Sequence, residues 1–233
     1  PELLRSELQA CRDRGLPIAF GTATDPYQPA EREFRITRRL LEVFAEFEGL
    51  EFSITTKGAG LILGDLDLLK TISSRHRFSV HMTVTTTDER LARLLEPKAP
   101  PPWKRLEAVS KLAAAGIYAG VNAMPILPGI TDSPAMLEDL VRQAAGAGAQ
   151  FLHANVLFLM PSAMKRFMPF LEREFPHLVR RYRKLYGHSA YLSPEYKQGM
   201  QALVAGLRAR YGLESRRGDA PLAKRYGQLA LNL

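Results

Sequence analysis

The stretch FSVHMTVTTTDERLARLL, residues 78–95, contains one complete strand-to-helix unit. Its first seven residues alternate apolar and polar side chains, with Phe78, Val80, Met82 and Val84 on one face, as in a strand. Asp88 then supplies a side chain suited to cap a helix N-terminus, and the leucine-rich segment after it has helical spacing. The stretch therefore predicts a strand followed directly by a helix that packs back on it.

The same order recurs along the chain. Strands are predicted at residues 16–20, 51–55, 78–84, 117–123 and 151–158, with helices at about 31–47, from 64, from 88, at 103–115 and at 132–147. From there the chain is expected to be mainly helical to about residue 212, with an irregular tail. Such alternation fits parallel strands in a doubly wound sheet or in a barrel. No G-x-G-x-x-G or G-x-x-x-x-G-K-[ST] motif is present, and polar residues follow the strands, which favours a barrel.

Composition is that of a folded globular protein, with 46% hydrophobic and 24% charged residues among 233, and this excludes disorder and a coiled coil. No run of eighteen uncharged apolar residues is present, so no membrane span is expected. The first twenty residues are rich in charge, which excludes a secretory leader, and we expect a cytoplasmic protein. The single cysteine, Cys11, excludes a disulfide framework and an all-cysteine metal site within the chain.

The net charge is +8, and the basic excess lies in the last third of the chain. Residues 165–184 hold most of this basic excess. They form either a solvated helix face or a region that weakly attracts phosphate or nucleic acid. No base-stacking or groove-reading motif accompanies these charges. The basic residues are Lys165, Arg166, Arg173, Arg180, Arg181, Arg183 and Lys184.

A dense polar loop, GTATDPYQPAE at residues 21–31, follows the first predicted strand. Two prolines restrict it, and so many polar groups cost stability that helix capping alone does not require, which favours a binding role over a capping loop. Its candidate site residues are Thr22, Thr24, Asp25, Tyr27 and Gln28.

Further candidates lie on or after the other strands. Lys57 could bind a carboxylate, act as a base or Schiff-base amine, or be a surface lysine. Ser79 and His81 lie on a polar face of a strand whose other face is apolar, which indicates a lined cavity, although a core histidine is the alternative. The remaining candidates are Glu96 with Arg105, either as a structural ion pair or as a grip for a ligand amine, and Asn122, with His153 and Asn155 as weaker ones.

Several of these motifs together resemble the radical S-adenosylmethionine (SAM) superfamily and, within it, the branch related to spore photoproduct lyase. The resemblance covers roughly residues 5–160, and its first motif is the most specific. The motifs are GTATDPYQPAE at 21–31, TTK at 55–57, DLDLL at 65–69, EPKAP at 96–100, RL at 105–106, AGI at 115–117 and PILPGITD at 125–132.

This resemblance implies a partial (β/α)6 TIM-like barrel that holds a [4Fe–4S] cluster and SAM at its open end. Such enzymes reduce the sulfonium through the cluster and form a 5′-deoxyadenosyl radical that abstracts hydrogen from a substrate, here unknown. A ferredoxin or flavodoxin would supply electrons to the full enzyme. By position, Lys57 would meet the methionyl carboxylate, Ser79 and His81 the ribose or amino-acid part, and Asn122 to Pro125 the adenine. Thr22 and Thr24 would also contact the cofactor, whereas Asp25, Tyr27, Gln28, Glu96 and Arg105 would face the substrate.

One departure limits the resemblance. The family holds its cluster with three thiolates in C-x-x-x-C-x-x-C after the first barrel strand, and Cys11 is the single cysteine here. We therefore expect the first strand and the cluster loop upstream of residue 1, and we expect the chain as given to be inactive. A relative that has lost radical chemistry is the alternative account.

Other functions stay open at this stage. They are DNA photoproduct-lyase-like repair, a metal-free barrel lyase that uses Lys57 as a Schiff-base amine, and a binding module for an adenosyl ligand without catalysis. The predicted division places the barrel core at residues 1–190 and a helical extension with a tail at residues 191–233.

Overall fold

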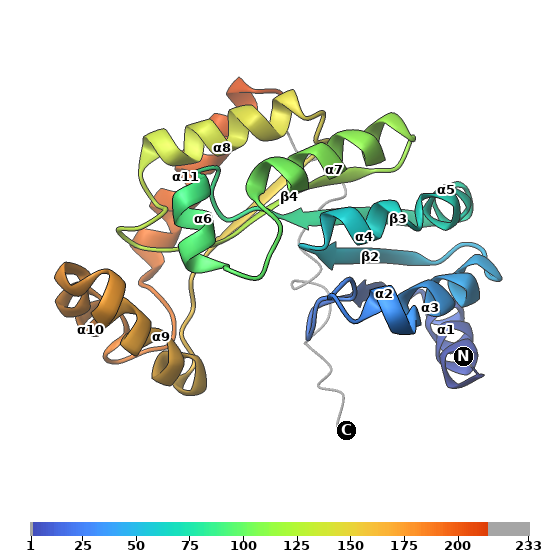
Figure 1. Ribbon diagram of the computed structural model, residues 1–233, viewed down its shortest axis with the longest axis horizontal. Coiled ribbons are helices and arrows are strands. Elements are labelled where there is room, and N and C mark those ends of the chain that lie inside the picture. Colours follow the sequence, from blue (N-terminus) through green and yellow to red (C-terminus); the bar gives the residue numbers. More distant parts are fainter. Residues whose placement is uncertain (1, 214–233) are drawn as a thin grey trace.

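The computed structural model describes residues 2–213, and its centre is a sheet of five parallel strands in the order β1-β2-β3-β4-β5 (Figure 1). Each strand pairs with the one before it in the sequence, for example Phe52 with Phe78 in the β2–β3 ladder. The strands are β1 (Ile18–Phe20), β2 (Glu51–Thr56), β3 (Arg77–Thr83), β4 (Ala119–Ile126) and β5 (Leu152–Val156).

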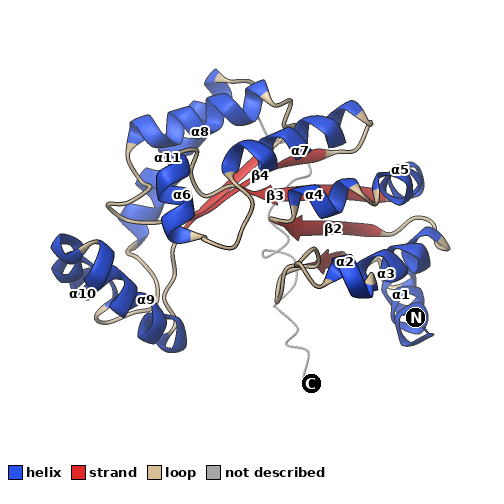
Figure 2. Cartoon of the chain, in the orientation of Figure 1, coloured by secondary structure: helices blue, strands red, loops and turns tan. Residues whose placement is uncertain are grey.

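Helices connect every pair of neighbouring strands (Figure 2). The predicted α/β fold of alternating strands and helices is therefore confirmed. The helices are α1 (Glu2–Asp13), α2 (Glu31–Phe34), α3 (Ile36–Ala45), α4 (Ala59–Leu63), α5 (Leu66–Arg75), α6 (Glu89–Leu95), α7 (Pro102–Ala114), α8 (Pro134–Gly146), α9 (Pro161–Glu174), the 3₁₀ turn η1 (Pro176–Leu178), α10 (Val179–Tyr186) and α11 (Pro194–Arg210).

The strand order decides which face of the sheet is apolar. Right-handed crossovers between successive neighbouring strands all return on the same side, so the helices cover one face. α5 and α7 pack on β3, α7 and α8 on β4, and α11 on β5. Accordingly Ile54, Val80 and Met82 are fully buried, whereas Ser79 and His81, which alternate with them, stay partly exposed on the other face. The second face is therefore free to carry polar side chains.

Side-chain caps fix the starts of α6 and α8. The Asp88 carboxylate accepts a hydrogen bond from the Leu91 N–H at 2.9 Å, which confirms it as the cap of α6. Of the two cap candidates for α8, Ser133 is the cap, since its hydroxyl accepts from the Met136 N–H. Asp132 instead accepts from the Gly129 N–H and so closes the preceding turn.

The predicted single helix at 31–47 is wrong. The chain breaks at Arg35, whose φ of 48° is left-handed, and this residue ends α2 and begins α3. Thr37 explains the break, because its N–H donates to the Glu31 carboxylate and its hydroxyl donates to the Pro26 carbonyl. These contacts tie the start of α3 to the loop before α2.

A second difference from the predicted elements is α4 (Ala59–Leu63), a short helix that was not predicted from the sequence. The last helix, α11, packs on β5 and α8, and the predicted boundary at residue 190 stays a prediction.

The predicted irregular tail falls on residues 214–233, which lie outside the described part of the chain. Among residues 2–213, no helix combines the length and the apolar character that crossing a membrane requires.

Candidate functional site

The loop after β1 is fastened to the end of β2 by Asp25. Its Oδ1 accepts hydrogen bonds from the Thr56 hydroxyl at 2.6 Å and from the Tyr27 N–H at 2.9 Å. Its Oδ2 accepts from the Lys57 N–H at 2.8 Å. The carboxylate thus holds the Thr56 side chain and the Lys57 backbone N–H at the end of β2. The substrate-facing role predicted for Asp25 stays a prediction.

Close backbone approach in this region depends on glycine. Gly21 has a φ of 95°, and a Cβ at this position would lie 2.3 Å from the Thr55 carbonyl oxygen. A Cβ at Gly58 would lie 2.4 Å from the Cβ of Tyr27. A side chain at either position would push the loop away from β2, so both glycines keep the two strand ends together.

A charged cluster occupies the ends of β2 and β3. The Glu96 carboxylate contacts the Lys57 Nζ at 3.0 Å through Oε1 and the Arg105 Nη1 at 2.6 Å through Oε2. Arg105 is only 1% exposed, and its guanidinium also donates to the carbonyl oxygens of Pro100 at 2.7 Å and Thr83 at 3.1 Å. It therefore ties the loop before α7 to the end of β3.

The ionisation of Glu96 follows from this setting. Burial by itself raises the pKa of the Glu96 carboxyl, but the positive charges and hydrogen bonds of Arg105 and Lys57 outweigh burial and hold this pKa below its ordinary value. The predicted Glu96–Arg105 ion pair is present. The cluster has two cations for one carboxylate, and the Lys57 side chain is 40% exposed, so an anionic group could reach it.

A second polar group lies on β3 and β4. His81 Nε2 is 2.9 Å from the Ser79 Oγ, and His81 Nδ1 is 3.3 Å from the Asn122 Oδ1. Because the amide oxygen can only accept, the ring donates from Nδ1, and Nε2 of the neutral ring accepts from the Ser79 hydroxyl. The His81 ring also packs on Phe151 and His153, with ring centroids 4.6 Å and 5.5 Å apart.

The two polar groups adjoin each other through Thr83. Its carbonyl accepts from Arg105, and in the β3–β4 ladder it pairs with Asn122. Asp25, Lys57, Ser79 and Asn122 are therefore linked by short contacts along the sheet. The ligand-binding roles predicted for these residues stay predictions.

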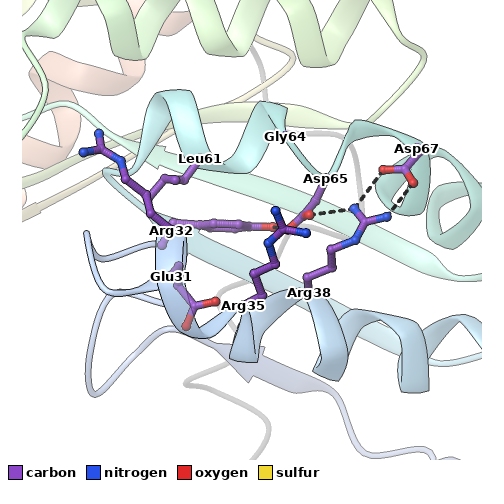
Figure 3. A pocket seen from close by; sticks show the side chains of 9 residues that line it. Glu31, Arg32, Arg35, Arg38, Leu61, Gly64, Asp65 and Asp67 are labelled. Atoms are coloured by element: carbon purple, nitrogen blue, oxygen red, sulfur yellow. Dashed lines mark hydrogen bonds and ion pairs between the residues drawn. The ribbon is translucent and has the colours of Figure 1, made fainter.

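Tyr27 is directed elsewhere. Its ring is buried, and its hydroxyl donates to the Asp65 Oδ2 at 3.1 Å. Burial, the Asp65 charge and this hydrogen bond together raise the pKa of the Tyr27 phenol well above its usual range. Tyr27 and Asp65 line a polar pocket of about 550 Å³ between the α2–α3 region and α4–α5, where Arg38 bridges Asp65 and Asp67 (Figure 3). The Tyr27 hydroxyl thus binds Asp65 rather than the Lys57–Glu96 cluster, and its predicted substrate-facing role stays a prediction.

The other predicted residues lie near the surface. Thr22, Thr24 and Gln28 are exposed on the loop after β1, and their predicted roles stay predictions. Pro125 is exposed and follows a cis peptide bond from Met124.

A mainly apolar pocket of about 790 Å³ was not predicted. It lies between α6, α9 and the segments that follow β3, β4 and β5, and Pro125, Thr85 and Glu96 form part of its lining. Phe158, which follows β5 and lines this pocket, is 54% exposed, which the sequence does not reveal because it was predicted to end the fifth strand. Phe167 and Phe170 on α9 also line it, but their helical spacing is equally typical of a core face.

The side chains of this chain do not fit a [4Fe–4S] cluster. Such clusters need several thiolates, and Cys11, the single cysteine in the sequence, lies on α1. Within residues 2–213, no group of three His, Cys, Asp or Glu side chains is placed to hold a metal ion.

Comparison with known families identifies the fold. The model of the radical SAM superfamily matches residues 1–142 of this chain. The chain belongs to the radical SAM superfamily. This assignment confirms the family resemblance seen in the sequence, whereas the individual roles predicted for site residues stay predictions.

Relatives in this superfamily extend beyond the chain. The uncharacterized protein Rv2578c of Mycobacterium tuberculosis is 36% identical over 219 residues, which is 94% of this chain and 64% of that protein. The uncharacterized protein MJ0683 of Methanocaldococcus jannaschii is 30% identical over 160 residues, or 68% of this chain and 56% of that protein. The chain thus spans less than two thirds of the length of these relatives.

Solved radical SAM structures share the fold. A double mutant of spore photoproduct lyase with bound AdoMet and dinucleoside spore photoproduct has a TM-score of 0.63 at 16% identity, over 89% of this chain and 63% of the lyase. Streptococcus suis SuiB bound to its precursor peptide SuiA has a TM-score of 0.53 at 12% identity, over 76% of this chain and 39% of SuiB. At these identities the likeness shows the fold, which is the partial TIM barrel expected.

Proposed function

We propose that this chain forms the SAM-binding barrel of a radical SAM enzyme. The observation that carries the proposal is the continuous polar set from Asp25 to Asn122, which joins an accessible lysine to neutral hydrogen-bonding groups on the open face of a parallel sheet. Bound and reduced in a complete enzyme of this kind, SAM supplies a 5′-deoxyadenosyl radical that abstracts a hydrogen atom.

The residues present suit the parts of SAM. Lys57 offers a positive charge for the methionyl carboxylate, and Glu96 offers an acceptor for the amino group beside it. Ser79, His81 and Asn122 offer neutral donors and acceptors suited to ribose hydroxyls. Asp25 and Arg105 position the other residues of this set. Asp25 binds the backbone N–H of Lys57, and Arg105 binds the carboxylate of Glu96.

The cluster needs ligands from outside this sequence. We infer that a polypeptide segment not included here supplies the thiolates, because the chain has one cysteine and its relatives are longer. An electron donor such as a ferredoxin or flavodoxin would act on that complete enzyme. The 233-residue chain alone is then expected to bind SAM without cleaving it.

Two alternatives receive less support. Schiff-base chemistry needs an amine that is free to attack a carbonyl, whereas the Lys57 Nζ is engaged by the Glu96 carboxylate at 3.0 Å. Nucleic-acid binding through residues 165–184 loses part of its basis, since Arg173, Arg181 and Arg183 form ion pairs with carboxylates of this chain. A lyase that acts on DNA is one version of the proposed radical SAM enzyme. Identifying the substrate would decide whether this version is correct.

Calorimetry with SAM tests the proposal. Wild type should bind, and Lys57→Ala should weaken the affinity about tenfold, because one charge-assisted contact at a half-exposed side chain is lost. Lys70→Ala, which removes an exposed lysine from α5, is the matched control and should bind as wild type does. No binding by wild type, or equal affinities for wild type and Lys57→Ala, would refute the assignment.

A further inference from the structure

The apolar pocket beside the polar site has the size of a small-molecule site. Its volume is about 790 Å³, within the range of about 300–1,000 Å³ typical of pockets that enclose small organic ligands. Its wall is built from leucine and phenylalanine side chains of α6, α9 and the segments after β4 and β5. These are Leu94, Leu95, Leu127, Leu157, Phe158, Leu159, Phe167 and Phe170.

The pocket shares residues with the polar site. Glu96 lines it, and the same carboxylate contacts Lys57 and Arg105. Thr85, whose hydroxyl lies 3.4 Å from the Glu96 Oε2, lines it as well. A molecule in the pocket would therefore lie next to the place where the methionyl end of SAM is proposed to bind.

Two arginines of α9 line the pocket, Arg166 and Arg173, and they differ in whether a carboxylate pairs with them. Arg173 forms an ion pair with Glu174 at 2.6 Å, and its guanidinium lies 5.8 Å from the centre of the Phe170 ring. Arg166 also lines the pocket and is exposed, and among residues 2–213 it has no carboxylate at ion-pair distance. One guanidinium without a carboxylate partner among residues 2–213 thus lines a pocket that is mainly apolar and aromatic.

We propose, building on the function above, that the substrate is an amphipathic small molecule with an apolar, preferably aromatic body and a carboxylate or phosphate at one end. The body packs between α6 and α9, where the phenylalanines offer ring contacts. The anionic end pairs with Arg166, since guanidinium binds both kinds of oxyanion through paired N–H donors. Because Glu96 and Thr85 line the same pocket, the bound molecule lies next to the proposed SAM site.

Fluorescence and calorimetric binding of three matched probes tests the inference: 2-naphthoate, 2-naphthyl phosphate and the neutral 2-naphthamide. Both anions should bind wild type about tenfold more tightly than the amide, and the tighter of the two anions identifies the preferred group. Arg166→Ala should remove this preference. Lys165→Ala, a neighbouring exposed cation of α9 that does not line the pocket, should keep it.

A second variant tests the location. Ser162 lines the pocket and is exposed, so Ser162→Trp should fill the pocket without disturbing the core and should abolish binding of all three probes. Equal affinities for the three probes, unchanged binding by Ser162→Trp, or equal losses in Arg166→Ala and Lys165→Ala would overturn the proposal. Tight binding of a single-stranded oligonucleotide that both α9 variants weaken alike would assign these charges to nucleic acid instead.

SAM binding separates this inference from the proposed function. Arg166→Ala should bind SAM as wild type does, whereas Lys57→Ala should keep the anion preference in the probe experiment. If wild type binds the probes as expected but does not bind SAM, the proposed function fails alone. If it binds SAM but ignores the probes, only the substrate class fails.

Discussion

Replacing Arg105 with methionine should destabilise the protein more than any single change to an exposed charge. The substitution keeps an unbranched side chain of related length but removes the positive charge and every N–H donor. The Glu96 carboxylate would retain only the half-exposed Lys57 as its counter-ion. The carbonyl oxygens of Pro100 and Thr83 would each lose a donor.

The magnitude follows from burial. Removing one partner of a buried ion pair costs about 3–5 kcal/mol, because the remaining charge stays desolvated. Lys57 reduces this cost and the two carbonyls increase it, so we expect a loss of about 3–4 kcal/mol in the free energy of unfolding. For a chain of this size that corresponds to a fall of roughly 6–16 °C in melting temperature.

Urea unfolding followed by circular dichroism measures the loss, with Lys111→Met as the matched control. Lys111 lies on the same helix, α7, and forms an ion pair with Glu107 at 2.8 Å, but both side chains are about half exposed. That control should unfold close to wild type, since exposed pairs contribute little.

A double variant decides whether the desolvated charge is the cause. Arg105→Met combined with Glu96→Leu removes both partners and should be more stable than Arg105→Met alone by about 1–2 kcal/mol. If the double variant is as unstable as the sum of the two single variants, the ion pair is not what makes Arg105 important. If Arg105→Met unfolds at the same urea concentration as wild type, the reasoning from burial is wrong.

Two further changes test the backbone and the core. Gly21→Ala should lower the free energy of unfolding by about 1–3 kcal/mol in urea titrations, because its Cβ would meet the Thr55 carbonyl oxygen. Gly49→Ala, also at a positive φ but with open space around it, should cost less. Equal losses in the two variants would contradict the role given to close backbone approach. Burial lowers the pKa of His76, whose Nδ1 accepts from a backbone N–H, so its contribution to stability is complete above pH 6.5 and is lost as the pH falls through the folded-state value. The stability of wild type should therefore fall between pH 7.5 and pH 5 more steeply than that of His76→Gln, and parallel pH profiles would argue against this.

The sequence was sufficient for the parts of the fold that repeat. Alternation in β3 predicted both its strand and its two unlike faces, and the Asp88 cap predicted where α6 begins. The break at Arg35 could not be predicted, because a left-handed arginine carries no local signal and is fixed by contacts of Thr37 with residues earlier in the chain.

The candidate site was predictable residue by residue but not in its connections. Spacing suggested the Glu96–Arg105 pair, since the two are close in the sequence. The contact of Lys57 with Glu96 depends on how β2 and the loop after α6 meet in space. Likewise, the family resemblance assigned Asp25 to the substrate side, which stays a prediction, and its hydrogen bonds to the end of β2 could not be read from the sequence.

The two faces of β3 have a consequence for how such a protein could change over time. Phe78, Val80 and Met82 serve the packed layer, whereas Ser79 and His81, interleaved with them, serve the open one. Under the proposed function, codons for folding and codons for ligand choice thus alternate within a single stretch of the gene. A lineage could therefore explore new ligands at every second position of this strand while the scaffold beneath it stays intact.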